Sequence, residues 1–202
     1  MKVFVFDTET TGFINKKESS LIKQPHIIQF AGILGDFTNG EFKEEKRIDV
    51  YINPGIPIPY SSSLVHNIYN IDIQDKKNIE YHIEDILYHI NIPDIIIGHN
   101  VEYDEEMVKL ELKRLGREYD YRPKQVMCTM KTTVDFCAIK GNGERYKYPK
   151  LGELYKTLFG EYFVGAHNAI IDVENTLKCF VELVNKGVLH VEEKKETIMS
   201  LF

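Results

Sequence analysis

The sequence predicts a single α/β domain, and two runs of apolar residues carry that prediction. Residues 3–6 (VFVF) are four apolar residues of high β-propensity and predict a buried first strand. Residues 94–98 (DIIIG) predict a central strand, because three successive isoleucines leave no face for solvent. Helical periodicity elsewhere supplies the layers that cover such a sheet, and 202 residues suit one domain with a sizeable core.

The first quarter of the chain predicts three strands in an antiparallel meander. Residues 26–34 (HIIQFAGIL) predict a mostly buried second strand, and residues 47–52 (RIDVYI) alternate as a third. We expect turns at residues 35–36 (Gly-Asp) and 39–40 (Asn-Gly) between these two strands. Links this short join antiparallel neighbours, so the three strands are expected side by side.

The rest of the chain predicts helices separated by loops and short strands. An exposed loop is expected at residues 14–24, and a stiff irregular segment with three prolines at residues 53–60. The remaining elements are read from apolar spacing and from cap and stop signals. They are a short helix with capping serines at 61–71, helices at 78–92 and 100–115, and a strand at 125–129. Helical segments at 129–139 and 150–159 lie around a loop at 140–148, and a long helix runs from 165–169 to 185–187.

We predict one domain over residues 1–187 and a short charged tail over residues 188–202. No run of about 18 apolar residues is present, which argues against a membrane partner. No cleavage region follows the first two residues, so no signal peptide is expected. Three cysteines, odd in number and without zinc-site spacing, favour reduced thiols. These features predict a cytoplasmic protein.

The charge balance limits the kind of nucleic-acid contact that the chain could make. A formal net charge of −6 argues against wrapping nucleic acid over a broad basic surface. It is compatible with an enzyme that grips a few nucleotides at a metal-filled cleft, since metal ions cancel acidic charge where an anionic substrate sits. Lys147 and Lys150 could contact phosphates, although a lone basic pair is usually just solvated.

Two carboxylates one residue apart end the predicted first strand. Asp7 and Glu9 share one face of that strand, because side chains at i and i+2 point the same way, while Thr8 points away. Two converging carboxylates repel each other unless a cation or a proton lies between them. The pattern indicates a site for a hard divalent metal with oxygen ligands. The alternative is a strand that simply ends in polar residues.

Three further residues stand where functional side chains are common. Asp104 follows the buried isoleucine strand, and ligand sites in open α/β sheets lie at such strand-to-helix junctions. Asp172 lies in the first turns of a helix whose other residues are core, so it faces either solvent or a site. His167 precedes Asp172 by five residues, in the loop or at the helix start.

The order of these motifs resembles the DEDDh family of 3′–5′ exonucleases. The matching motifs are FDTETTG at residues 6–12, HNxxxD at residues 99–104 and HxxxxD at residues 167–172. Weaker similarities lie at residues 53–55, 65–68 and 148–151. Each motif alone is weak evidence, but the three together, in order and each at a strand or helix end, are specific, and the resemblance spans about residues 1–185.

The resemblance implies a ribonuclease-H-like fold with a mixed five-stranded sheet and helices on both faces. It implies that Asp7, Glu9, Asp104 and Asp172 hold two Mg²⁺ or Mn²⁺ ions, in the two-metal arrangement of phosphodiester hydrolysis. Asp7 would bridge the ions, Glu9 and Asp172 would complete the ion that carries the attacking water, and Asp104 would serve the leaving-group ion. His167 would act as general base.

The same resemblance implies a set of contacts to the terminal nucleotide. In the family, the turn after the first strand meets the terminal 3′-OH and an apolar residue wedges against the last base, a sequence-tolerant contact. The residues at the matching positions are Thr8, Thr10, Thr11, Gly12, Phe13, His66, Asn100 and Tyr103. The chain departs from the family at Asn67, where glycine is common, and this departure puts the loop around His66 in doubt.

The function expected from this resemblance is release of nucleoside 5′-monophosphates from the 3′ end of nucleic acid. Single-stranded DNA, in proofreading, repair or replication, is the favoured substrate, and RNA 3′-end trimming is the alternative. A catalytically dead binding module is less favoured, because all five expected residues are present. A phosphatase of the haloacid-dehalogenase type is disfavoured by the glutamate at Glu9. The candidate partners are a nucleic acid 3′ end, a DNA polymerase and a second copy of the chain, although the short tail favours a stand-alone nuclease or a weakly tethered proofreader.

Overall fold

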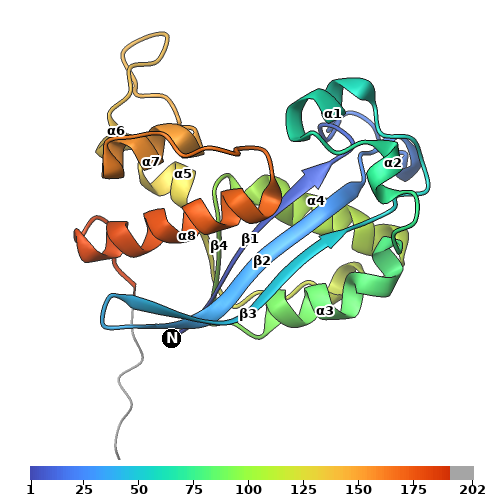
Figure 1. Ribbon diagram of the computed structural model, residues 1–202, viewed down its shortest axis with the longest axis horizontal. Coiled ribbons are helices and arrows are strands. Elements are labelled where there is room, and N and C mark those ends of the chain that lie inside the picture. Colours follow the sequence, from blue (N-terminus) through green and yellow to red (C-terminus); the bar gives the residue numbers. More distant parts are fainter. Residues whose placement is uncertain (192–202) are drawn as a thin grey trace, which may run out of the picture.

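A mixed five-stranded sheet forms the centre of the computed structural model, which describes residues 1–191 (Figure 1). The strand order is β3-β2-β1-β4-β5. β1 pairs antiparallel with β2 and parallel with β4, while β2 pairs antiparallel with β3, and β4 pairs parallel with β5. The strands are β1 (Lys2–Thr10), β2 (Ile27–Thr38), β3 (Glu41–Tyr51), β4 (Ile95–Gly98) and β5 (Val126–Cys128). This sheet confirms the predicted fold class.

Helices cover both faces of the sheet (Figure 1). The helices are α1 (Tyr60–His66), α2 (Asn70–Ile73), α3 (Ile79–Asn91), α4 (Val101–Arg114), α5 (Thr129–Thr132), α6 (Val134–Cys137), α7 (Leu151–Phe159) and α8 (Ala169–Asn185), with single turns of 3₁₀ helix at Leu21–Lys23 and Glu118–Asp120. α3 and α4 pack on one face of the sheet, and α7 and α8 pack on the other.

The alternation of β1 divides the core into two layers. Phe4 and Phe6 point to the α3 and α4 side, where their rings stack with centroids 5.8 Å apart. Val3 and Val5 point to the opposite side and pack with α7 and α8. All four side chains are buried. Because both faces are covered along residues 3–6, β1 is fixed at the middle of the sheet, and its polar end is the part that reaches the surface.

The hairpin of β2 and β3 is longer than the sequence predicts, and one expected turn is wrong. Residues 39–40 do form the turn, but Gly35 lies inside β2, beside a register shift between Leu34 and Gly35. A Cβ on Gly35 would lie 2.2 Å from the carbonyl oxygen of Lys43. The glycine therefore permits a close approach between strands instead of a turn.

Two expected helices are divided. The segment at 61–71 forms α1 and α2, separated by Asn67 in the left-handed conformation (φ 58°). The segment at 129–139 forms α5 and α6, with a break at Thr133. The expected serine cap is also wrong, because Pro59 precedes α1 and no side chain caps it. Ser62 instead donates a hydrogen bond to the carbonyl oxygen of Thr11, 2.9 Å away.

The C-terminal boundary falls at the edge of the described residues. Of the expected tail, residues 192–202 lie outside the described part of the chain. Leu189 is buried in the same core layer as α8. The division into a domain at 1–187 and a tail at 188–202 stays a prediction. Within residues 1–191, no helix has the length and apolar character needed to span a bilayer.

Candidate active site

Three carboxylates converge where the polar end of β1 meets the start of α8. Oxygen atoms of Asp7, Glu9 and Asp172 all lie within 4.8 Å of one another. Asp7 and Glu9 come from the same face of β1, as the strand alternation predicts. The start of α8 is fixed by Gln29 of β2, whose side-chain oxygen accepts a hydrogen bond from the backbone N–H of Ala169 at 3.2 Å. The sheet thus sets the position of Asp172.

Asp104 joins this group from the first turn of α4. Its side chain is buried, and Oδ1 accepts two hydrogen bonds from Thr8, one from the backbone N–H at 3.0 Å and one from the hydroxyl at 2.6 Å. Its negative charge is, after burial, the largest influence on the pKa of Asp7. Asp7 therefore experiences the charge of Asp104 as well as the charges of Glu9 and Asp172.

The electrostatics of the cluster are those of a cation site. Burial and the neighbouring carboxylates raise the pKa of Asp7 well above its usual value, and they raise the pKa of Glu9 to about 8. Burial raises the pKa of Asp104 to about 7 and that of Asp172 to about 6. Without a cation, negative charge here is costly.

The donor set fits a divalent metal. Carboxylate oxygens are the ligands that Mg²⁺ and Mn²⁺ prefer. Oδ1 of Asp172 is buried and makes no hydrogen bond with any described residue, whereas Oδ2 accepts one from the backbone N–H of His167 at 2.9 Å. A buried carboxylate oxygen beside two others is satisfied by a cation. The residues present therefore fit the expected metal.

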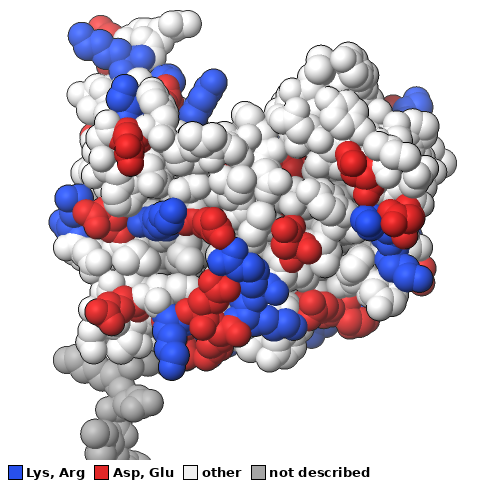
Figure 2. All heavy atoms as spheres, in the orientation of Figure 1, with Lys and Arg blue, Asp and Glu red and all other residues white. Residues whose placement is uncertain are grey.

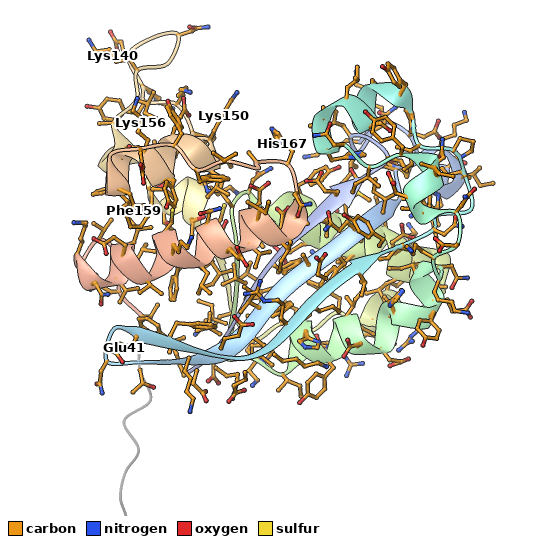
Figure 3. All side chains as sticks on the ribbon, in the orientation of Figure 1. Glu41, Lys140, Lys150, Lys156, Phe159 and His167 are labelled. Atoms are coloured by element: carbon orange, nitrogen blue, oxygen red, sulfur yellow. The ribbon has the colours of Figure 1, made fainter. Side chains whose placement is uncertain are left out.

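His167 projects from the loop between α7 and α8. Its backbone is left-handed (φ 67°), and its side chain is exposed. Figure 3 shows the labelled side chain above the start of α8. It lies at a notch in the outline of the molecule, between α1 and the part that carries α5, α6 and α7. Among the described residues no hydrogen-bond partner holds the imidazole, so the ring is free to meet a substrate or water beside Glu9.

A pocket of about 470 Å³ adjoins the carboxylates on the α1 side. It brings together seven of the eight residues expected to contact substrate, with Glu9 and His167 at its edge. The walls are Thr8, Thr10, Thr11, Gly12, Phe13 and Tyr103 together with Pro59, Ser61, Ser62, Val65 and His66 of α1 and its approach. The sequence reasoning missed Pro59, Ser61, Ser62 and Val65, and the uncharged serine-rich run beside His66 is the one signal that could have indicated them.

The turn after β1 is held rigid by side-chain hydrogen bonds. The hydroxyl of Tyr103 donates to the carbonyl oxygen of Gly12 at 2.7 Å and lies 2.7 Å from Oγ1 of Thr10. The ring of Phe13 meets the edge of Tyr103, with centroids 6.5 Å apart, but remains 92% exposed. An aromatic ring this exposed at a pocket mouth offers a stacking surface for a base.

His66 lies at the inner wall of the pocket. It is 5% exposed, and its Nδ1 accepts a hydrogen bond from the backbone N–H of Ile68 at 3.0 Å. Burial lowers the pKa of His66, and because Nδ1 accepts a hydrogen bond, the neutral ring carries its proton on the buried Nε2, whose interaction with the backbone of Thr10 partly opposes that shift. Asn67, the departure from the family pattern, adopts a left-handed conformation (φ 58°) that asparagine tolerates, so the loop keeps its turn.

Asn100 is the expected substrate residue that the structure does not place in the pocket. It stands before α4 in a left-handed conformation (φ 74°), exposed to solvent. Its neighbour His99 is positioned differently, with Nε2 donating to the carbonyl oxygen of Pro149 at 2.9 Å and Nδ1 lying 3.0 Å from the hydroxyl of Thr129. His99 thereby ties the end of β4 to the segment before α7.

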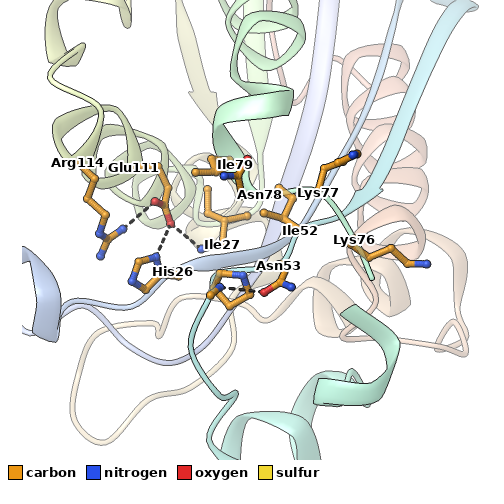
Figure 4. Close-up of a pocket in the computed structure, with 12 residues that line it drawn as sticks. His26, Ile27, Ile52, Asn53, Lys76, Lys77, Asn78, Ile79, Glu111 and Arg114 are labelled. Atoms are coloured by element: carbon orange, nitrogen blue, oxygen red, sulfur yellow. Dashed lines mark hydrogen bonds and ion pairs between the residues drawn. The ribbon is translucent and has the colours of Figure 1, made fainter. Parts of the chain in front are cut away.

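A buried ion-pair network supports the turn from behind (Figure 4). Glu111 of α4 is 1% exposed, accepts the backbone N–H of Ile27 at 3.0 Å, and lies 2.9 Å from Arg114 and 3.4 Å from His26. The backbone of His26 exchanges two hydrogen bonds with Thr11, each 2.9 Å long. The network therefore fixes the position of the turn relative to α4.

The exonuclease family model (RNase_T) matches residues 4–180, most of the chain. No curated protein is similar enough in sequence to count as a match. Exonuclease X in complex with 5′-overhanging duplex DNA is 22% identical with a TM-score of 0.58, over 93% of this chain and 94% of that one.

Two exonuclease I structures share the fold at lower identity. The Escherichia coli enzyme in complex with a dA16 oligonucleotide is 17% identical with a TM-score of 0.70, over 91% of this chain and 41% of that one. A moderately thermophilic exonuclease I from Methylocaldum szegediense is 17% identical with a TM-score of 0.69, over 92% of this chain and 40% of that one. The chain spans about two-fifths of exonuclease I.

Proposed function

The chain belongs to the exonuclease family as a DEDDh-type 3′–5′ exonuclease, and we propose that it removes nucleoside 5′-monophosphates from the 3′ end of single-stranded DNA with two divalent ions. The observation that carries the proposal is the convergence of three carboxylate oxygens within 4.8 Å beside a pocket of about 470 Å³. When bound, two ions stabilise the attacking and leaving oxygens of an in-line displacement at phosphorus.

The surroundings of each carboxylate support its proposed role. Asp7 experiences the charge of all three neighbours, which supports a bridging position between two ions. Glu9 lines the pocket beside His167, and Asp172 accepts a hydrogen bond from the backbone of that histidine, which supports roles near the attacking water. Asp104 is held by Thr8 and lies outside the group of three, so the role near the leaving group that the family resemblance implies falls to it.

His167 is the proposed general base. Its ring is exposed, stands beside Glu9 at the pocket, and is not engaged by another described side chain. A free ring nitrogen can accept a proton from the attacking water, and such proton transfer typically contributes about 10²–10⁴-fold to a rate. In this proposal His167 accepts the proton of the attacking water, and the carboxylates bind the divalent ions.

The pocket is the proposed seat of the terminal nucleotide. The turn after β1 and α1 line this pocket, and Thr10, Thr11 and Gly12 of that turn border the space that a terminal 3′-OH would enter. Phe13 and Tyr103 supply aromatic surface for the base, a contact that every base can make.

The preference for DNA rests on similarity of fold. Exonuclease X and exonuclease I structures contain DNA, as duplex with a 5′ overhang and as a dA16 oligonucleotide. A role in DNA repair, replication or proofreading is proposed on the family resemblance alone. Three free cysteines support a reducing compartment such as the cytoplasm. A polymerase partner and a homodimer remain predictions from the family resemblance.

Degradation of 5′-labelled oligonucleotides tests the proposal. Single-stranded DNA, duplex DNA, RNA and DNA with a single 3′-terminal ribonucleotide are incubated with Mg²⁺ or Mn²⁺, with EDTA and Asp7→Asn as negative controls. We expect a ladder that shortens from the 3′ end, fastest on single-stranded DNA, and lost in both controls. Cleavage that survives EDTA, or no cleavage of any substrate, would refute the activity, and faster cleavage of RNA would reassign the substrate.

A further inference from the structure

We propose that the segment carrying α5, α6 and α7, residues 129–159 and here named the basic lobe, binds the phosphates of the strand upstream of the nucleotide in the pocket. This inference rests on the proposed function, since it concerns the path of the same single strand. It assigns a second binding surface, for the sugar-phosphate backbone of single-stranded nucleic acid, outside the carboxylate site and its pocket.

The charge of the basic lobe is opposite to that of the whole chain. The lobe holds six Lys or Arg against three Asp or Glu, while the chain has a formal net charge of −6. Two of the six are neutralised, because Lys131 pairs with Glu102 at 2.6 Å and Lys147 pairs with Glu153 at 2.5 Å. The other four, which have no ion-pair partner among residues 1–191, are Lys140, Arg145, Lys150 and Lys156.

Three of these four cations are available to an anion in solution. Lys140, Arg145 and Lys150 are exposed, whereas the ammonium group of Lys156 lies over the ring of Tyr162, 4.6 Å from its centroid. Figure 3 shows Lys150 directed upward beside the notch and Lys140 at the outer end of the loop. Figure 2 shows Lys and Arg side chains at these places on the lobe. A phosphate backbone is the ligand that a row of unpaired cations attracts.

The loop that bears these cations has a defined structure. The backbone N–H of Lys147 donates to the carbonyl oxygen of Ile139 at 2.9 Å, and an isolated β-bridge joins Lys140 to Tyr146. Tyr146 and Tyr148 are 47% and 58% exposed, so aromatic rings alternate with the cations. Aromatic rings interleaved with basic groups are the usual composition of a sequence-tolerant single-strand surface.

The basic lobe is anchored to the catalytic end of the sheet. Nε2 of His99, at the end of β4, donates to the carbonyl oxygen of Pro149, directly before Lys150. Lys131 of the lobe binds Glu102, two residues before Asp104 in α4. These contacts hold the segment that precedes Lys150, and the start of the lobe, against the end of β4 and the first turn of α4.

The strand that leaves the pocket can continue past His167. α1 and the turn after β1 line the pocket together with His167, whose side chain stands above the start of α8 (Figure 3). Beyond His167 the notch opens toward Lys150 and the basic lobe (Figure 3). The α1 wall contrasts with the lobe, because residues 50–71 contain no Asp, Glu, Lys or Arg, and this part of the surface is largely white in Figure 2. An uncharged surface suits contact with the base of the terminal nucleotide, and a basic surface suits contact with the phosphates upstream of it.

A triple variant, Lys140→Ala/Arg145→Ala/Lys150→Ala, tests the surface against a matched control, Lys43→Ala/Lys113→Ala/Lys178→Ala. The control removes three exposed lysines that have no ion pair among the described residues and that belong to β3, α4 and α8. Affinity for a fluorescein-labelled oligothymidylate longer than one pocket is measured by anisotropy in EDTA at several salt concentrations. This readout needs no hydrolysis, so it stays informative if the proposed exonuclease activity fails.

We expect the triple variant to bind the oligothymidylate at least about 10-fold more weakly at low salt, and the control to bind like the wild type. The slope of log affinity against log salt should fall by roughly 2, because each lost contact to a single strand contributes about 0.7. Tyr146→Ala/Tyr148→Ala should weaken binding several-fold with an unchanged slope. Equal affinity and slope in the triple variant and the control would overturn the proposal.

A small substrate separates the basic lobe from the catalytic site. The p-nitrophenyl ester of thymidine 5′-monophosphate occupies the pocket and has no upstream phosphate. We expect the triple variant to hydrolyse it within about twofold of the wild type while its KM for the oligothymidylate rises. An equal loss on both substrates would show that these residues support the catalytic site and would overturn the upstream contact. Failure of the wild type to hydrolyse either substrate would refute the proposed function. The anisotropy measurement would still test binding by the basic lobe in that case.

Discussion

Thr8 donates two hydrogen bonds to a single oxygen of Asp104, one from its backbone at 3.0 Å and one from its hydroxyl at 2.6 Å. Both donors favour the charged carboxylate, and they oppose the burial that raises the pKa of Asp104 to about 7. The residue between Asp7 and Glu9 therefore serves the same cluster as its neighbours, through a carboxylate brought by α4. Asp104 is oriented by β1 before any metal arrives.

The substitution Thr8→Val tests this orienting contact, because valine keeps the shape and removes the hydroxyl. We expect the Mg²⁺ concentration for half-maximal activity to rise about 10–100-fold, the usual cost of losing a group that orients a metal ligand. Thr8→Ser should restore most of the affinity, since it returns the hydroxyl. A valine variant with wild-type Mg²⁺ dependence would show that the backbone N–H alone holds Asp104.

Without metal, the carboxylate cluster should make stability fall as pH rises. A carboxylate whose pKa is higher in the folded than in the unfolded state binds more protons when folded, so its contribution is present at low pH and is lost as pH rises through the folded value. The pKa of Asp7 is raised well above its usual value and that of Glu9 to about 8. In EDTA, Tm should therefore decline between about pH 4 and pH 8, and saturating Mg²⁺ should reverse the decline at pH 8.

Asp7→Asn is expected to stabilise the metal-free protein while abolishing activity. At pH 8 the folded protein must either bury the charge of Asp7 or hold a proton on it, and asparagine removes that cost, so the free energy of unfolding should rise by about 1 kcal/mol or more, which corresponds to roughly 2–4 °C in Tm. At low pH, where Asp7 is already protonated, the gain should vanish. Asp135→Asn, at an exposed position, serves as control and should change neither value. A loss of stability in Asp7→Asn at pH 8 without metal would contradict the electrostatic account of the cluster.

The parts of the fold that the sequence predicts correctly depend on local pattern. Residues 3–6 lie at the middle of the sheet because an uninterrupted apolar run has no face for solvent, and the two-residue alternation places Asp7 with Glu9. These two inferences need only neighbours in sequence. For Asp172 the sequence leaves open whether the side chain faces solvent or a site, because the start of α8 is fixed by Gln29 of β2, 140 residues away.

The errors arise where distant partners decide. Gly35 carries a local turn signal, but pairing with β3 overrides it, because the approach of Lys43 leaves no room for a Cβ. Ser62 carries a cap signal, but its hydroxyl binds the turn at Thr11, 51 residues away. The bond from Thr8 to Asp104 spans 96 residues, and no spacing rule indicates it. Contacts of this kind appear only in the folded chain.

His167 requires a variant that separates its side chain from its backbone. The residue has φ 67°, a conformation that asparagine adopts readily, so His167→Asn should keep the loop and the backbone hydrogen bond to Asp172. We expect kcat to fall about 10²–10⁴-fold, with the Mg²⁺ dependence and the affinity for single-stranded DNA unchanged. Isothermal titration with Mg²⁺ measures the metal affinity, and anisotropy with labelled DNA measures the affinity for single-stranded DNA. An equally large loss of metal affinity would make His167 a positioning residue instead of the base.

Glu111 should contribute both to stability and to recognition of the 3′ end, although it lies behind the turn. Glu111→Gln leaves Arg114, whose side chain is 15% exposed, without its countercharge, and losing one partner of a buried pair typically costs about 3–5 kcal/mol. The KM for a 3′ end should also rise, because Glu111 holds the backbone at Ile27, beside the hydrogen bonds of His26 to Thr11.

The pH dependence of Glu111→Gln gives the sharper test. His26, Arg114 and the backbone of Ile27 lower the pKa of Glu111 in spite of its burial. A carboxylate with a lowered folded pKa contributes stability above its unfolded value, near pH 4, and loses it as pH falls through the folded value. Urea unfolding should therefore show a large difference from the wild type at pH 7 that shrinks below about pH 4. Glu106→Gln, on the exposed face of α4, should stay within about 0.5 kcal/mol at every pH, and a difference for Glu111→Gln that persists unchanged in acid would mean that packing, not charge, holds the turn.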